Sequence, residues 1–170
     1  EVDMLEETYL KIISNKTASL FLAAAKIGPI ITEKESKYKD ALESYGKNLG
    51  LTFQIADDAL DYNSDLKLFG KNIGNDFFEG KVTLPIILLF QKINDNEKQF
   101  LKDLFLKDSR TDNDLKIVLN LIQKKNIINE CYKKAEHYIN LSSNSLNIFE
   151  NSEDKNILKN LTTFSLERNF

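Results

Sequence analysis

Three carboxylates stand close together in the sequence, Asp57, Asp58 and Asp61. On an α-helix each residue turns by about 100°, so Asp57 and Asp61 lie about 40° apart and Asp58 about 100° from Asp57. Gln54 projects between Asp57 and Asp58, so one amide shares this sector with the three acids. Like charges four positions apart destabilise a helix, and no basic residue lies within one turn of the three. We therefore expect three unpaired carboxylates, a costly arrangement unless a cation is present.

Two structural interpretations compete with a cation site. Charge runs are usually solvated faces, and aspartate favours helix ends over helix interiors. Phe53, Ala56 and Leu60 on the opposite face indicate a packed helix, so we place the cation site first. Carboxylate oxygens suit Mg²⁺, which takes one or two carboxylates together with waters and substrate phosphates. The spacing of an EF-hand calcium loop is absent.

Three lysines are candidates for holding the phosphates that accompany such a magnesium ion. Lys16 stands beside Thr17 in a mostly apolar helical segment, where a lysine either reaches the surface or points into a polar cleft. Taken by itself, a lysine at this position is expected to extend its side chain to the surface. Lys71 and Lys81 follow the aspartates in a glycine-rich stretch, whose backbone amides can approach phosphate oxygens. The P-loop pattern is missing from this stretch.

Helices are the elements predicted to position these residues, because apolar residues recur at helical spacing and no strand pattern stands out. The segments expected to be helical are residues 5–27, ending at a Gly28-Pro29 stop, then about 33–65, 83–92, 97–107, 112–124, 127–148 and 154–167. Residues 63–80 are predicted to be irregular. Gly46 and Gly50 lie four positions apart inside a helix, where glycine costs stability, so they predict a close approach of another backbone.

Length and composition fit one all-α domain over residues 1–170, with 42% hydrophobic and 29% charged residues. The net charge of −3 gives no basic field to attract nucleic acid, and no apolar run is long enough to span a membrane. One cysteine and one histidine exclude an intramolecular disulfide and argue against a zinc site. The lone thiol and an acidic N-terminus unlike a signal peptide predict a cytoplasmic protein.

Four motifs, in this order, resemble those of the trans-polyprenyl diphosphate synthases, the prenyltransferases of the all-α isoprenoid synthase fold. They are Lys16-Thr17-Ala18, Gly50-x-x-Phe53-Gln54-Ile55-x-Asp57-Asp58-x-x-Asp61-Tyr62, Gly70-Lys71-x-x-Gly74-x-Asp76 and Glu79-Gly80-Lys81-x-Thr83-Leu84-Pro85. The resemblance covers about residues 9–89. The third and fourth motifs are similar to those of bacterial long-chain enzymes of the octaprenyl type.

The resemblance implies a helical bundle in which Mg²⁺ bridges a second Asp-rich motif to an allylic diphosphate. The metal ligands that it implies are Asp57, Asp58 and Asp61. The residues that it places against the substrate are Lys16, Thr17, Gln54, Lys71 and Lys81, and those that it makes catalytic are Lys16, Asp57, Asp58 and Lys71. The implied reaction ionises the allylic diphosphate and alkylates isopentenyl diphosphate, with electrostatic stabilisation and no protein nucleophile. A homodimer is implied as well.

The family's first Asp-rich motif and the basic segment after it have no counterpart in residues 1–16. Family members run to roughly twice this length. The chain therefore resembles the C-terminal half of one, an incomplete copy of the bundle that we expect to be inactive alone. Two alternatives stay open, a non-catalytic subunit of a heteromeric prenyltransferase and a terpene cyclase relative. The retained aspartates and lysines argue against the first, and residues 79–85 against the second.

Overall fold

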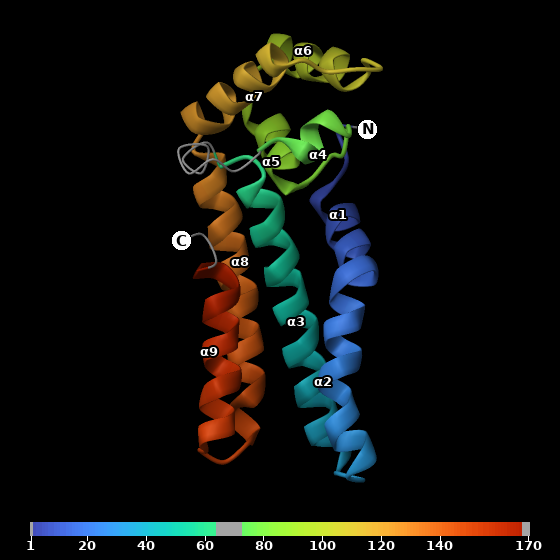
Figure 1. Cartoon of the computed structure of the whole chain (residues 1–170), viewed down its shortest axis with the longest axis vertical. Helices are drawn as coiled ribbons and strands as arrows, with labels where there is room; N and C mark the ends of the chain where they lie inside the picture. Colours follow the sequence, from blue (N-terminus) through green and yellow to red (C-terminus); the bar gives the residue numbers. More distant parts are fainter. Residues whose placement is uncertain (1, 64–72, 168–170) are drawn as a thin grey trace. The chain divides into compact units, whose positions relative to one another are not determined.

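The computed structural model describes residues 2–63 and 73–167, and every regular element within these ranges is a helix (Figure 1). The all-α prediction is therefore confirmed. The chain divides into two compact units, one formed by Glu1–Tyr9 with Asp57–Cys131 and the other by Leu10–Ala56 with Tyr132–Phe170. We name them the Asp57 unit and the Gly46 unit. That residues 1–170 form a single domain stays a prediction.

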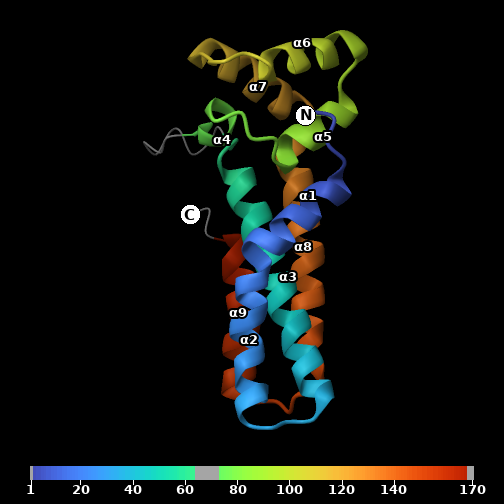
Figure 2. The same ribbon diagram turned by 90° about the vertical axis from the view of Figure 1, so that its right-hand side faces the viewer.

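The Gly46 unit is built from long helices that lie side by side (Figures 1 and 2). It contains the end of α1 (Glu6–Ile13), the π-helical segment η1 (Ser14–Ala18), α2 (Ser19–Ile31), most of α3 (Ser36–Leu60), most of α8 (Ile127–Ser145), the 3-10 segment η3 (Leu146–Ile148) and α9 (Glu153–Glu167). Short connections join α2 to α3 and α8 to α9, so the helices of each pair run antiparallel.

Two glycines allow α3 to approach the end of η1 and α2 closely within this unit. A Cβ atom on Gly46 would lie 2.5 Å from the carbonyl oxygen of Phe21, and one on Gly50 would lie 2.6 Å from the Cα of Ala18. Both distances are shorter than any normal contact, and both neighbouring atoms are backbone. The predicted close approach of another backbone is confirmed.

Tyr45 joins three helices of the Gly46 unit. Its hydroxyl donates to the carbonyl oxygen of Leu158 on α9 at 2.9 Å, and its own carbonyl oxygen accepts from Ser142 on α8 at 2.9 Å. Its ring packs with Leu49 and Leu146 in the buried core. The face of α3 opposite the acidic sector is therefore packed, as the apolar spacing predicts.

Helix α2 runs through Gly28 and Pro29 to Ile31, so the predicted stop at Gly28-Pro29 is wrong. A proline at this position removes the hydrogen bond that its amide would donate and crowds the carbonyl oxygen four residues earlier, yet the helix continues for two more residues. The helix ends where Glu33 takes a left-handed φ of 50°. The amide of Lys34 then donates to the carbonyl oxygen of Pro29 at 3.0 Å, the long bond of a Schellman motif.

The Asp57 unit holds shorter helices after the end of α3. These are α4 (Asn75–Phe78), α5 (Leu84–Lys92), α6 (Asp95–Phe105), α7 (Asp112–Lys124) and the start of α8. Pro85 lies in the first turn of the largely buried α5, as predicted. The helix α4 lies within residues 63–80, which were predicted to be irregular. That prediction is wrong for Asn75–Phe78. No helix among residues 2–63 and 73–167 is both long and apolar enough to cross a bilayer.

Candidate functional site

The three aspartates occupy three different environments at the end of α3. Asp57 is exposed, Asp58 is 3% exposed, and Asp61 is half-buried just beyond the last helical residue. The expectation of three unpaired carboxylates is wrong for Asp58 and Asp61. Their partners come from other segments of the Asp57 unit, which the geometry of one helix cannot reveal.

Asp58 is held by a tyrosine from the start of α1. The hydroxyl of Tyr9 donates to Oδ2 of Asp58 at 2.6 Å, and both side chains are buried. Burial, and then the neighbouring Asp58 carboxylate, raises the pKa of Tyr9. The hydroxyl therefore keeps its proton at physiological pH and remains a donor. Asp58 is thus an acceptor fixed in the interior.

Asp61 contacts the backbone of residues that follow it by 13 to 15 positions. Its Oδ1 accepts from the amide of Asn75 at 3.0 Å and its Oδ2 from the amide of Asp76 at 2.8 Å. Its carbonyl oxygen accepts from the amide of Gly74 at 2.7 Å. Burial raises the pKa of Asp61, although the amides of Asp76 and Asn75 favour the charged form and act in the opposite direction. Asp61 therefore caps the start of α4.

Lys81 is joined to the segment that Asp61 caps. Its Nζ lies 3.2 Å from Oδ1 of Asp76 and 2.6 Å from a carboxylate oxygen of Glu79. The hydrogen bond with Glu79, followed by the one with Asp76, raises the pKa of Lys81. This lysine is half exposed, so its charge reaches solvent beside the acidic residues. Lys71 lies outside the described residues.

Thr17 and Gln54 meet within the Gly46 unit. The hydroxyl of Thr17 donates to Oε1 of Gln54 at 2.7 Å, which joins η1 to α3. The π-helical turn that holds Thr17 also holds Lys16, whose side chain is exposed. Single π-helical turns within helices are frequent at functional sites. Lys16 and the aspartates belong to different units, so the shared phosphate-binding role expected of Lys16, Lys71 and Lys81 stays a prediction.

The carboxylates at the end of α3 can contribute to a magnesium site only together with other ligands. Within the described residues, no three His, Cys, Asp or Glu side chains form a group that could hold a metal ion. Mg²⁺ needs only one or two carboxylates when waters and phosphate oxygens supply its remaining ligands. Asp57 offers an exposed carboxylate, and Asp58 is its neighbour in the chain. A carboxylate site completed by a diphosphate therefore fits these residues, and a closed protein cage does not.

Tyr9 and Asp76 contact the candidate aspartates, although neither was among the predicted site residues. Tyr9 pairs with Asp58 across 49 positions, and no spacing within one helix predicts such a contact. Asp76 stands in the third motif, at the position after Asn75, so its place in the motif was the available signal. Its contact with Lys81 links the third and fourth motifs.

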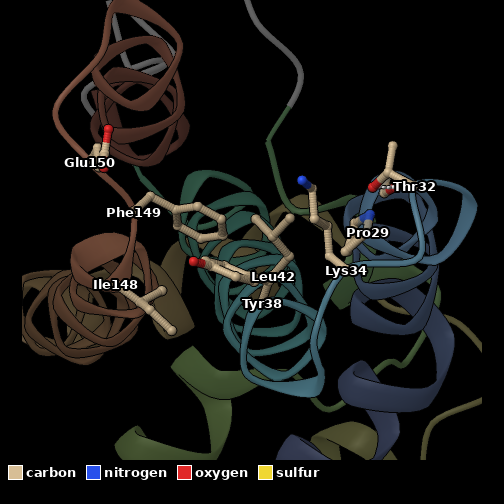
Figure 3. A pocket seen from close by; sticks show the side chains of 9 residues that line it. Pro29, Thr32, Lys34, Tyr38, Leu42, Ile148, Phe149 and Glu150 are labelled. Atoms are coloured by element: carbon tan, nitrogen blue, oxygen red, sulfur yellow. Dashed lines mark hydrogen bonds between the residues drawn. The ribbon is translucent and has the colours of Figure 1, made fainter.

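A hollow of about 470 Å³ in the Gly46 unit contains none of the candidate residues. It lies where α2 ends and α3 begins, and Figure 3 shows Tyr38, Leu42 and Phe149 along its wall. Lys34 and Glu150 supply charged groups at its edge. Because no predicted site residue lines it, this hollow is not part of the candidate site.

Comparisons with known proteins give relatives along the whole chain. The sequence is 33% identical over 166 residues to the all-trans-nonaprenyl-diphosphate synthase (geranyl-diphosphate specific) of Rhodobacter capsulatus, covering 98% of this chain and 50% of that protein. It is 46% identical over 85 residues to the octaprenyl diphosphate synthase of Escherichia coli, covering 50% of this chain and 26% of that protein. The chain spans about half the length of the first of these relatives.

The fold is similar to that of a solved prenyl synthase. A polyprenyl synthase from Caulobacter crescentus, complexed with calcium and isoprenyl diphosphate, matches with a TM-score of 0.91 and 33% identity, covering 100% of this chain and 52% of that chain. The family model described as polyprenyl synthetase matches residues 1–122. Since this match takes in more than half of the chain, the protein belongs to the polyprenyl synthetase family.

Proposed function

We propose that this chain supplies the carboxy-terminal half of a trans-polyprenyl diphosphate synthase. The whole enzyme condenses isopentenyl diphosphate with an allylic diphosphate. Two facts support the proposal. The four motifs follow the order of the carboxy-terminal half of the family, and the chain spans about half the length of its relatives. The calcium and isoprenyl diphosphate of the Caulobacter crescentus complex belong to that protein, and they make a cation with a diphosphate the natural ligand to test here.

The observation that carries the proposal is the exposed Asp57 carboxylate beside two carboxylates held by other segments. Tyr9 holds Asp58, and the start of α4 holds Asp61. A solvent-facing acid on a rigid helix end, backed by fixed acids, attracts a divalent cation while keeping its own position. A bound Mg²⁺ would supply the positive charge that stabilises a departing diphosphate.

The lysines, Thr17 and Gln54 are the residues that we propose bind the substrate. Lys16, Lys71 and Lys81 neutralise the diphosphate, since a lysine is a compact point charge suited to phosphate oxygens. The hydrogen bond between Thr17 and Gln54 fixes two polar groups on facing helices at the wall of the substrate cavity. The substrate ionises without a protein nucleophile, and stabilisation of the leaving group lowers the barrier.

The product, the assembly and the location are further parts of the proposal. The similarity of the third and fourth motifs to octaprenyl-type enzymes supports a long-chain product. The relatives named here make nonaprenyl and octaprenyl diphosphates. Exposed apolar side chains on α2 and α9, among them Leu20, Ile31 and Phe164, support assembly into a homodimer. The lone buried cysteine suits the cytoplasm.

Calorimetry with Mg²⁺ and inorganic pyrophosphate tests the proposed site on the 170-residue chain. We expect metal-dependent binding by the wild-type chain and a loss of at least about tenfold in affinity for Asp57→Asn, which corresponds to roughly 1.4 kcal/mol. Asp40→Asn is the matched control, because Asp40 is an exposed aspartate on the same helix. Circular dichroism should show equal helix content in all three. Unchanged binding by Asp57→Asn would contradict the proposed site.

A further inference from the structure

The oxygen atoms of Asp61 accept hydrogen bonds from the backbone of a single short segment. Both carboxylate oxygens and the carbonyl oxygen accept amide hydrogens, from Asn75, Asp76 and Gly74 respectively, at 2.7 to 3.0 Å. Three consecutive backbone amides thus donate to one residue, and these hydrogen bonds tether the segment to Asp61. An aspartate serving mainly as a metal ligand would direct its oxygens toward the ion.

The segment that donates these hydrogen bonds is short and has no side-chain cap of its own. The helix α4 has only four residues, far below the length at which a helix is stable alone. Its N-cap is Gly74, which has no side chain to satisfy the first amides of the helix. The Asp61 carboxylate supplies this missing cap from outside the helix. Gly74 also packs tightly on α7, since a Cβ atom there would lie 2.6 Å from the side chain of Leu115.

The tethered segment in turn holds Lys81. The amide of Lys81 donates to the carbonyl oxygen of Asp76 at 2.9 Å, and its Nζ lies 3.2 Å from Oδ1 of the same residue. A continuous set of contacts thus leads from Asp61, at the end of α3, through Asp76 to a lysine ammonium group. Every residue in this set lies in the Asp57 unit.

We propose that Asp61 is a positioning residue that sets the place of Lys81, and that it acts on diphosphate affinity through this lysine. The inference rests on the proposed function, because it assigns a diphosphate to the acidic face. Within that face, Asp57 is the carboxylate that meets the cation. Asp61 holds the segment that carries the positive charge for the phosphate oxygens.

A double-mutant cycle, with Mg²⁺ and inorganic pyrophosphate as the probe, distinguishes a positioning role of Asp61 from a role as an independent metal ligand. We expect Asp61→Asn and Lys81→Met each to weaken binding by roughly tenfold, and the double variant to bind no more weakly than the weaker single variant, because both changes remove the same interaction. If Asp61 were an independent metal ligand, the two losses would multiply to roughly a hundredfold. Multiplied losses would overturn the inference.

Amide hydrogen exchange without ligand tests the tether itself. In Asp61→Ala, the amides of Asn75 and Asp76, which donate to the Asp61 carboxylate, should exchange at least about tenfold faster than in the wild-type chain. Asp57→Asn, on the same helix end, is the control and should leave them unchanged. Equal exchange in Asp61→Ala and wild type overturns the inference alone. No pyrophosphate binding by the wild-type chain overturns the proposed function, and with it the link from Asp61 to diphosphate affinity.

Discussion

The hydroxyl of Tyr9 and the carboxylate of Asp58, 49 positions apart in the chain, form a buried hydrogen bond of 2.6 Å. Tyr9→Phe removes the donor and leaves an ionisable acceptor in the interior. We expect the free energy of unfolding to fall by about 1–3 kcal/mol, the usual range for removing one hydrogen bond to a buried polar group. Urea denaturation followed by circular dichroism measures it.

Tyr38→Phe is the control for this change. Tyr38 is half-buried and its ring lies 5.3 Å from that of Phe149, so the variant removes a hydroxyl while leaving the ring contact. Its effect should stay below that of Tyr9→Phe. Equal stability of Tyr9→Phe and the wild-type chain would show that the hydrogen bond to Asp58 has little weight.

The two glycines of α3 should tolerate no side chain. Alanine at either position gains up to about 1 kcal/mol of helix propensity. Its Cβ would, however, lie 2.5 Å from the Phe21 carbonyl oxygen at Gly46 or 2.6 Å from the Ala18 Cα at Gly50, and backbone atoms cannot move aside cheaply. We expect a net loss of about 1–3 kcal/mol for each substitution.

Gly28→Ala provides the matched control, because no atom lies within 4 Å of a Cβ at Gly28. This glycine is also helical, in α2, so the same propensity gain applies without a clash. Thermal unfolding should show Gly28→Ala at or above the wild-type midpoint, with Gly46→Ala and Gly50→Ala well below it. Three equal midpoints would contradict the close contact of α2 and α3.

Helix positions were largely predictable because apolar spacing is a local signal. The predicted segment 112–124 matches α7, Asp112–Lys124. The π-helical segment η1 was not predicted. One extra residue in a single turn barely changes the spacing of the apolar residues, so the sequence pattern there resembles that of an ordinary α-helix. The helix α4 was missed because its cap, Asp61, precedes it by 14 positions.

The positions of the three aspartates on the helix were predictable, but their contacts were not. The spacing of Asp57, Asp58 and Asp61 placed three acids on one sector, and all three lie at the end of α3. Tertiary contacts then gave each acid a different environment. A helical projection contains no information about Tyr9, which approaches from α1.

Asp114 should make stability depend on acid pH. The amide of Thr111, and then the Lys107 ammonium group, lowers the pKa of Asp114 from 3.8 to about 2. The pKa of Asp114 is lower in the folded state than in the unfolded chain. Its contribution to the free energy of unfolding is therefore complete above pH 3.8 and is lost as the pH falls toward 2. Asp114→Asn cannot titrate. The difference between the urea midpoints of the wild-type chain and this variant should shrink from pH 5 to pH 2, and a constant difference would contradict the assignment.

The exposed apolar side chains of α2 should drive self-association of the isolated chain. Leu20, Ile27 and Ile31 are 73%, 56% and 74% exposed, and they recur on one helix at spacings of seven and four. A face of this kind normally marks an interaction surface. Sedimentation velocity should show association that Leu20→Lys with Ile27→Lys reduces. Leu106→Lys, at an 80% exposed position in the turn after α6, should leave association unchanged. A wild-type chain that stays monomeric at high concentration would contradict the expectation.

The 170-residue chain alone should not elongate prenyl chains. Ionising an allylic diphosphate leaves charge that several cations must share, and the acidic face around Asp57 supplies one side of that arrangement. Losing several kcal/mol of this stabilisation slows the reaction by orders of magnitude, since each 1.36 kcal/mol is about tenfold in rate. An assay with farnesyl and isopentenyl diphosphates measures the rate. Pyrophosphate binding by the same preparation confirms that the site is folded. Steady production of longer prenyl diphosphates would show that the residues present here suffice for catalysis.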